Sequence, residues 1–193
     1  MNLITHLLTG WALANAVPLD RRDRAIVTIA SIAPDVDGLG IVVEHTPLNE
    51  IIPLHLFSDY HHVLAHNLGF GLLMFIIALI INRRKLLAPS MVFVVFHIHL
   101  LADIVGSRGP DGYQWPIPYL LPFSANCQVV WKGQWALVSW QNIAITIILM
   151  GLTIQLAWKR GYSPVEMISE RADAKIIETL RARFGMPGDR TLK

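Results

Sequence analysis

The feature that most constrains this chain is a series of apolar runs, each closed by a short cluster of basic residues. The clearest run covers residues 142–158 and ends at Lys159 and Arg160. A second run covers residues 68–81 and is followed by basic residues at 83–85. A helix of about 20 apolar residues crosses a bilayer. Because 53 % of the residues are hydrophobic and the mean hydropathy is +0.46, a membrane class is favoured over a soluble domain.

Three further apolar segments are shorter or carry polar interruptions. Residues 86–105 predict another spanning helix, and residues 2–17 predict a short first helix that ends before Pro18. Residues 25–43 are apolar except around Pro34, where a helix must break or kink. No basic region precedes the first apolar stretch, so this stretch does not have the pattern of a secretory signal.

These segments predict an all-α, multi-pass membrane protein with four to five membrane-embedded helices in a lipid bilayer. The membrane-embedded domain is expected to cover residues 1–160. It includes a long loop at 106–139 that is dense in Gly, Pro and Trp. Residues 161–193 are expected to form a separate cytoplasmic tail.

The C-terminal segment has the composition of a soluble helix. Ser163, Pro164 and Glu166 fit a capping box with Pro at the first helical position, and Gly185 marks the expected end of the helix. Apolar residues recur at broadly helical spacing among charged ones. We therefore expect a cytoplasmic amphipathic helix that lies on the membrane or packs on a partner.

The positions of the basic residues predict how the helices are oriented. Lys and Arg are retained on the cytoplasmic side of membrane helices, so residues 21–24, 83–85 and 159–160 should share the inner side. Each cluster of His and Asp then falls toward the outer side. His6 joins these clusters if the first helix enters from outside. Convergence of separate clusters at one depth predicts a single polar site.

Charge and cysteine content exclude two classes of function. The formal net charge is only +2, and the basic residues form short clusters instead of a stripe, which argues against nucleic acid as a partner. Cys127 is the single cysteine, so neither an intramolecular disulfide nor a thiolate zinc site is possible within the chain. Any metal must be held by nitrogen and oxygen atoms.

The strongest local motif is the pair His99 and Asp103. Their i, i+4 spacing places both side chains on one face of a helix, about one turn apart. A neutral imidazole and a carboxylate so placed can share a metal ion or bridge two. The alternative is a His–Asp hydrogen bond buried between helices, although ionisable groups near membrane segments tend to be functional.

A second cluster places three histidines within six residues: His61, His62 and His66. His62 and His66 share a helical face, whereas His61 and His66 do so only if the helix begins irregularly. Dense histidine clusters are typical of metal sites. For any single one of these histidines, a surface or interfacial role is the alternative.

Asp35 and Asp37 add carboxylates within an apolar segment. Pro34 helps to end the helix, so one or both carboxylates can point into a cavity, although an ordinary Asp-Gly turn is the alternative. His6 is weak evidence on its own, because a single histidine on an apolar face is more often a hydrogen-bonded core residue than a metal ligand. We expect four further residues to be supporting or structural: His45, His55, Asp59 and His97.

Histidine and aspartate without thiolates suit a divalent ion, with Zn²⁺ expected and Mn²⁺ or Fe²⁺ as alternatives. With two ions about 3.5–4 Å apart, a bridging water could lose a proton near neutral pH and attack a phosphoryl or carbonyl centre. The chain has no Gly-rich phosphate loop, Gly-x-Ser-x-Gly elbow or His-Glu-x-x-His motif. Catalysis by a nucleophilic Ser or Cys therefore has little support.

The order of these motifs resembles a known family. Thr5-His6, Ala33-Pro-Asp-Val-Asp37, His61 and His66, then His99-Leu-Leu-Ala-Asp103 and a Gly/Pro/Trp loop follow one another along the chain. This order is similar to bacterial inner-membrane proteins described as membrane-bound metal-dependent hydrolases, the LexA-regulated hydrolase family. It resembles the helical zinc-dependent phospholipase C enzymes more distantly. The likeness covers about residues 1–125.

The resemblance implies a helical metal centre in a bacterial inner membrane. Its pattern carries over to six metal ligands: His6, Asp35, His61, His66, His99 and Asp103. By analogy with the phospholipases, one ion would take Asp35, a histidine of the 61–66 cluster, His99 and Asp103, and His6 and Asp103 would serve another. Two departures stand out, because the basic residue expected before the second histidine is missing and the later His-x-x-x-Glu pair is absent.

We therefore expect a metal-dependent hydrolase whose site faces the outer side of the membrane and takes a lipid-linked or other phosphoester. Asp37 or His62 would orient the water or act as base. Arg108 would meet an anionic headgroup, or be a solvated loop cation. The alternatives are a non-enzymatic metal transporter or sensor, and a structural membrane protein with a metal-stabilised fold and a signalling tail.

Overall fold

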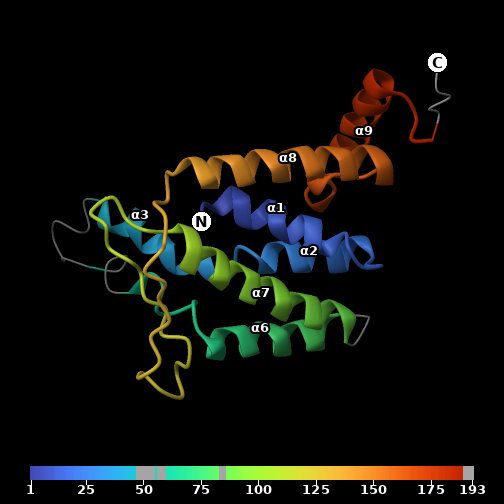
Figure 1. The fold of residues 1–193 in the computed structure, drawn as a ribbon. Coiled ribbons are helices and arrows are strands. Elements are labelled where there is room, and N and C mark those ends of the chain that lie inside the picture. Colours follow the sequence, from blue (N-terminus) through green and yellow to red (C-terminus); the bar gives the residue numbers. More distant parts are fainter. Residues whose placement is uncertain (47–54, 56–59, 83–85, 189–193) are drawn as a thin grey trace.

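The computed structural model describes residues 1–46, 55, 60–82 and 86–188 (Figure 1). Over these residues the regular structure is helical, which confirms the all-α expectation. The elements in chain order are α1 Leu3–Ala14, α2 Arg21–Ala30, the 3₁₀ helix η1 Pro34–Leu39, α3 Gly40–Glu44, α6 Leu68–Ile81, α7 Leu87–Gly106, α8 Trp140–Arg160, the 3₁₀ helix η2 Pro164–Met167 and α9 Glu170–Phe184.

Helices α1, α2, α6, α7 and α8 run alongside one another, and α9 stands at one end of this bundle (Figure 1). Helix α7 packs against α1, α2 and α6, and α1 also packs against α2 and α8. The buried core between α1, α2, α6 and α7 is rich in alanine and valine. Small side chains let the helix backbones approach closely, which is typical of packing within membranes.

Fewer helices than expected are long enough to cross a membrane. Within the described residues, α7 with 20 residues and α8 with 21 residues meet the length and composition of a span. The pair Arg21–Ala30 and Pro34–Val42, bent by 55°, gives a third if it counts as one broken span. The prediction of four to five was therefore too high, because α1 has only 12 residues and α6 only 14. At about 1.5 Å per residue these reach roughly 18 and 21 Å, short of a hydrocarbon core of about 30 Å.

The C-terminal helix begins later than the capping pattern predicted. Ser163 opens only the short η2 turn, and α9 starts after Ser169, whose side chain accepts from the Ala172 N–H. The reason is tertiary: the Glu166 side chain turns away to Arg24 instead of returning to the backbone of Ser163. The predicted end of this helix at Gly185, where φ is +78°, is confirmed.

A buried ion pair attaches this tail to the helix bundle. The guanidinium of Arg24 donates to both carboxylate oxygens of Glu166, at 2.9 and 3.0 Å, and lies 3.9 Å from the ring centroid of Tyr162. Arg21 adds a hydrogen bond to the Glu166 carbonyl. The tail therefore packs on the start of α2 in its own chain.

The two ends of the bundle differ in chemistry. The start of α2, with its arginines, and the end of α8, with Lys159 and Arg160, lie at the same end (Figure 1). Residues 83–85, the third basic cluster, lie outside the described residues. The basic ends fit the predicted inner side, and the orientation remains a prediction.

The single cysteine provides a direct test of this orientation. Cys127 lies in the long loop after α7, at the end of the bundle opposite Lys159. We expect a membrane-impermeant maleimide to label Cys127 in intact spheroplasts. In a Cys127→Ser background, Lys159→Cys should label only after the membrane is permeabilised. Labelling of position 159 without labelling of Cys127 would reverse the topology.

The Arg24→Ala variant tests how the tail is held. It leaves the buried Glu166 carboxylate without its partner, which costs about 3–5 kcal/mol. We expect protease cleavage of the tail to accelerate by more than about 100-fold, since about 1.4 kcal/mol corresponds to a factor of ten. Arg22→Ala, which removes an exposed arginine on the same turn, is the control and should leave the cleavage rate unchanged. Equal rates in both variants would contradict the attachment.

Candidate metal centre

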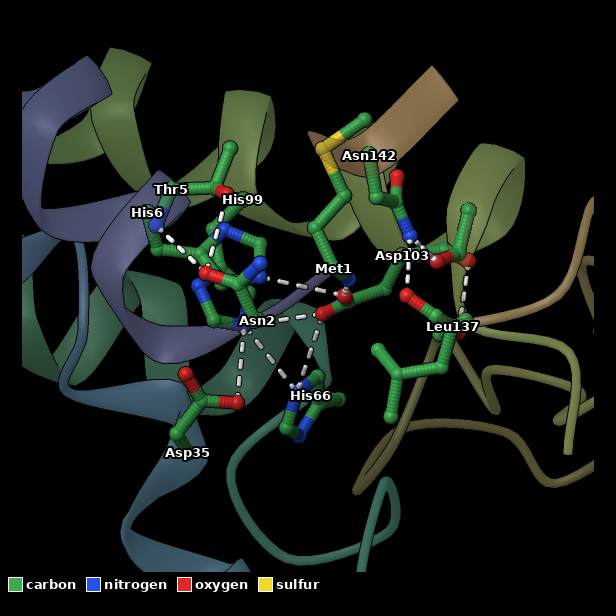
Figure 2. A network of polar contacts seen from close by, with 12 residues as sticks. Met1, Asn2, Thr5, His6, Asp35, His66, His99, Asp103, Leu137 and Asn142 are labelled. Carbon is green, nitrogen blue, oxygen red and sulfur yellow. Dashed lines mark hydrogen bonds and ion pairs between the residues drawn. The ribbon is translucent and has the colours of Figure 1, made fainter. Parts of the chain in front are cut away.

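One buried carboxylate, that of Asp103, gathers side chains from distant parts of the sequence (Figure 2). Helix α7 supplies Asp103 and His99, α1 supplies His6, and the first turn of η1 supplies Asp35. The segment before α6 supplies His66. Three helices and one irregular segment, from four separate stretches of sequence, therefore point polar groups at the same place.

The distances around Asp103 are those of direct contact. Its Oδ2 lies 3.0 Å from Nε2 of His99 and 3.5 Å from Nε2 of His66, and its Oδ1 lies 3.1 Å from Nε2 of His6. The amino group of Met1 also contacts Oδ1. Asp103 is only 2 % exposed, so these contacts are shielded from bulk water. A buried carboxylate of this kind is costly unless positive charge or donors surround it.

Backbone and carboxylate acceptors determine which nitrogen of two histidines faces the centre. The Nδ1–H of His99 donates to the Ser31 carbonyl at 2.8 Å, and the Nδ1–H of His66 donates to Oδ2 of Asp37 at 3.0 Å. In a neutral imidazole this leaves Nε2 as a lone pair. The two Nε2 atoms nevertheless lie only 3.2 Å apart. Two lone pairs at this distance need a cation between or beside them.

The 61–66 segment shows the same demand for positive charge. Burial lowers the pKa of His66, but its contacts with the carboxylates of Asp103 and Asp37 outweigh this and raise the pKa to about 9. Without a metal ion, a proton therefore supplies the cation. Burial keeps the pKa of His62 well below its usual value, so His62 is neutral and able to act as a ligand. A metal ion binding at this place would displace the proton on His66.

The structure distinguishes the neighbouring histidines His61 and His62. His62 is buried, has a φ of +66°, and its Nδ1 has no hydrogen-bond partner among the described residues. The His61 Nδ1–H instead donates to Oδ1 of Asp37 at 2.9 Å. Turns and bends, not a regular helix, cover most of residues 60–67. Helical spacing was therefore an unsuitable guide in this segment.

Asp37 lies behind the histidines and not at the centre. Its two oxygens accept from Nδ1 of His61, from Nδ1 of His66 and from the Ala65 N–H, the last at 3.1 Å. A carboxylate in this position orients a ligating imidazole and increases its basicity. The expected role of Asp37 as a base for water thus finds no direct geometric support, and its contacts favour the orientation of His66.

Two groups of donors could each hold an ion, and they share Asp103. The first is His6, Asp35, His99 and Asp103, and the second is His62, His66 and Asp103, with the donor atoms of each group within 4.8 Å of one another. His61 belongs to neither group. The resemblance had instead placed a histidine of the 61–66 cluster with Asp35, His99 and Asp103 at one ion, and His6 with Asp103 at another.

The donor set fits a divalent ion. Ligands about 2.0–2.2 Å from a tetrahedral zinc ion lie roughly 3.3–3.6 Å from one another. The Nε2 of His99 lies 3.7 Å from Oδ1 of Asp35 and 3.0 Å from Oδ2 of Asp103, close to that range. Three buried polar atoms that have no hydrogen-bond partner within the described part of the chain belong to this cluster: Oδ2 of Asp35, Oδ2 of Asp103 and Nδ1 of His62.

Arg108 and the remaining histidines make other contacts. The backbone of Arg108 pairs with residues 135–137 of the long loop after α7. His97 accepts from the Tyr119 hydroxyl at Nε2 and donates from Nδ1 to the Phe93 carbonyl. His45, whose Nδ1–H donates to the Ile41 carbonyl, and His55 are both exposed, and Asp59 lies outside the described residues.

Several residues that support the centre carry no signal in the sequence. Gln134, buried in the long loop after α7, donates to the Asp103 carbonyl at 2.7 Å and so holds that loop over the end of α7. Asn142 donates to the Gly106 carbonyl at 2.7 Å. Ser31 acts through its backbone carbonyl, which any residue could provide. Contacts of this kind depend on tertiary structure alone.

The fold and the site define a helical membrane protein with a buried His/Asp cluster near one end of its bundle. A family model described as YdjM inner membrane protein matches residues 1–172. The chain therefore belongs to this family of bacterial inner-membrane proteins. No curated protein and no solved structure matches it. The family description says nothing of hydrolysis or of phospholipase C.

Metal content tests the centre directly. We expect His66→Ala and His99→Ala to lose at least one bound ion per chain, measured by mass spectrometry of elements in detergent-purified protein. His97 lies two residues before His99 on α7 but is outside both donor groups. The His97→Ala variant is therefore the matched control and should keep its metal. Equal metal content in all three variants would remove the proposed cluster.

A second comparison separates the neighbouring histidines. We expect His62→Ala to abolish one ion-binding site, because His62 belongs to a donor group. His61→Ala should weaken affinity by about 10- to 100-fold without abolishing it, because His61 acts through Asp37. Titration of metal-stripped protein with Zn²⁺ measures both effects. The reverse order of effects would make His61 the ligand.

Proposed function

We propose that this protein is a membrane-bound, metal-dependent hydrolase acting on a phosphoester or lipid-linked substrate. One observation carries the proposal: the Nε2 atoms of His66 and His99 face one another at 3.2 Å beside the Asp103 carboxylate. A cluster of this composition suits Zn²⁺ first, with Mn²⁺ or Fe²⁺ as alternatives. The shared carboxylate allows one or two ions.

A bound ion would supply Lewis acidity and lower the pKa of a water molecule, so that the water can attack phosphorus or a carbonyl carbon. The protein residues do the rest. Asp103 and Asp35 supply negative charge that holds the cation, and Asp37 fixes the orientation of His66. The side chain of Asp35 is 21 % exposed, far more than that of Asp103. Water would therefore reach the centre from the Asp35 side.

We assign the acceptance of the water proton to His61, supported by Asp37. The Asp37 carboxylate accepts from the His61 Nδ1–H, which is the arrangement that orients a general base. His62, which together with Asp37 was expected to act in this step, is better suited to bind metal. The His61 ring lies 5.8 Å, centroid to centroid, from that of His66.

A non-enzymatic transporter or sensor is the alternative, because buried polar residues also occur along α2. Thr28 and Ser31 lie between the basic end of the bundle and the centre, and both are buried. The Thr28 hydroxyl donates to the Arg24 carbonyl, and the Ser31 hydroxyl donates to the carbonyls of His6 and Thr28. These contacts support a packing role for both side chains, and so favour a closed site over a path through the membrane.

Hydrolysis can be tested with purified, metal-loaded protein in detergent, using a chromogenic phosphodiester and a set of phospholipids. We expect turnover that chelation removes and Zn²⁺ or Mn²⁺ restores. Asp103→Asn should reduce turnover by more than about 100-fold, beyond the loss typical of a supporting residue. His97→Ala should retain it. Stoichiometric metal without turnover on any substrate would favour the non-enzymatic alternative.

A further inference from the structure

Two grooves meet beside the candidate metal centre. The first, of about 620 Å³, is almost entirely apolar and follows α6; its walls include Leu64, Phe70, Leu73, Ile76 and Phe123. The second, of about 740 Å³, is more polar, and its walls include His61, Asp111, Tyr113, Trp115 and Gln128. Val63 and Leu121 line both grooves, so the two adjoin each other.

The apolar groove opens on the surface that α6 presents to the bilayer. Leu73 and Ile76 line this groove and are 50 % and 51 % exposed. Further apolar residues on the same helix are also exposed. Within a membrane these side chains contact lipid tails. The groove is thus continuous with the lipid-facing surface, and a hydrocarbon chain can enter it without crossing water.

The polar groove adjoins the metal centre through the histidine cluster. His61 lines the groove. The Asp37 carboxylate accepts hydrogen bonds from both His61 and His66, and so links His61 to the centre. The Trp115 ring lies 5.3 Å from the ring of His62, centroid to centroid. A group resting on His61 and Trp115 would therefore lie beside the histidine cluster.

The far wall of the polar groove has the chemistry that recognises an ammonium group. Asp111 supplies a carboxylate, and the rings of Tyr113 and Trp115 meet edge to face with centroids 5.2 Å apart. A Cβ placed on Gly109 would lie 2.8 Å from Oδ1 of Asp111 and 3.6 Å from Nε1 of Trp115, so the carboxylate lies near the N–H edge of the indole. Carboxylates and aromatic faces together bind organic cations.

We propose that the two adjoining grooves bind one phospholipid whose headgroup carries a primary ammonium. Its acyl chain lies along α6, its phosphate lies beside His61, and its ammonium group lies against Asp111, Tyr113 and Trp115. The placement of the phosphate as a group for cleavage rests on the proposed function. A water-soluble phosphoester would leave the apolar groove without an occupant.

Native mass spectrometry of the full-length protein tests lipid binding, with phosphatidylethanolamine and phosphatidylglycerol of matched chains as probes. We expect the ethanolamine lipid to bind about tenfold more tightly. Asp111→Asn should remove this preference, and its amide oxygen can still accept from the Tyr113 N–H as Oδ1 does. Equal affinity of the wild-type protein for both lipids would overturn the headgroup assignment.

The acyl-chain groove is tested by filling it. Leu73→Trp should reduce binding of both lipids by about tenfold. Ile80→Trp changes an equally apolar residue on the same helix, 78 % exposed and outside the groove walls, and should leave binding unchanged. Equal binding by the two variants would overturn the groove as the chain site, and equal loss in both would mean that the effect comes from α6 in general.

Metal-stripped protein separates this inference from the proposed hydrolysis. Ethanolamine-lipid binding should persist without metal, because none of the groove contacts needs the ion. If the lipid binds selectively but is never hydrolysed, the proposed function fails and the groove assignment stands. If soluble phosphodiesters are hydrolysed while neither lipid is bound, the groove assignment fails and the proposed function stands.

Discussion

The structure depends on one electrostatic constraint, which is the need for a cation where two imidazole nitrogens and a carboxylate meet in a buried place. Nε2 of His66 and Nε2 of His99 are 3.2 Å apart, and Asp103 lies against both. Without positive charge this arrangement would be strongly unfavourable. A proton on His66 satisfies it in the ion-free protein, and a metal ion would satisfy it with more ligands at once.

The irregular parts of the fold lie where they serve this constraint. The break after α2 frees the carbonyl of Ser31 for His99 and turns Asp35 and Asp37 toward the histidines. The turns of residues 60–67 let Asp37 reach two imidazoles and one backbone N–H. Regular helices, by contrast, form the remainder of the bundle. Local departures from regularity at a cluster of ionisable groups are typical of functional sites.

Sequence reasoning predicted what depends on local pattern. The helix at residues 68–81 has the predicted bounds, and the i, i+4 pair His99 and Asp103 lies on one face of a helix. It overestimated the number of spans, because the apolar run that forms α6 was counted although it has only 14 residues. It also could not separate His61 from His62, or place the start of α9, because tertiary contacts of Asp37 and Arg24 decide both.

Anomalous X-ray diffraction from crystals of the zinc-loaded protein, recorded at the zinc absorption edge, tests the central claim most directly. A peak about 2.0–2.2 Å from Nε2 of His66 or of His99, and at a similar distance from a carboxylate oxygen of Asp103, is the expected result. Two imidazoles in direct contact with no peak between or beside them would contradict it, because the cluster would then be a hydrogen-bonded core that needs only a proton.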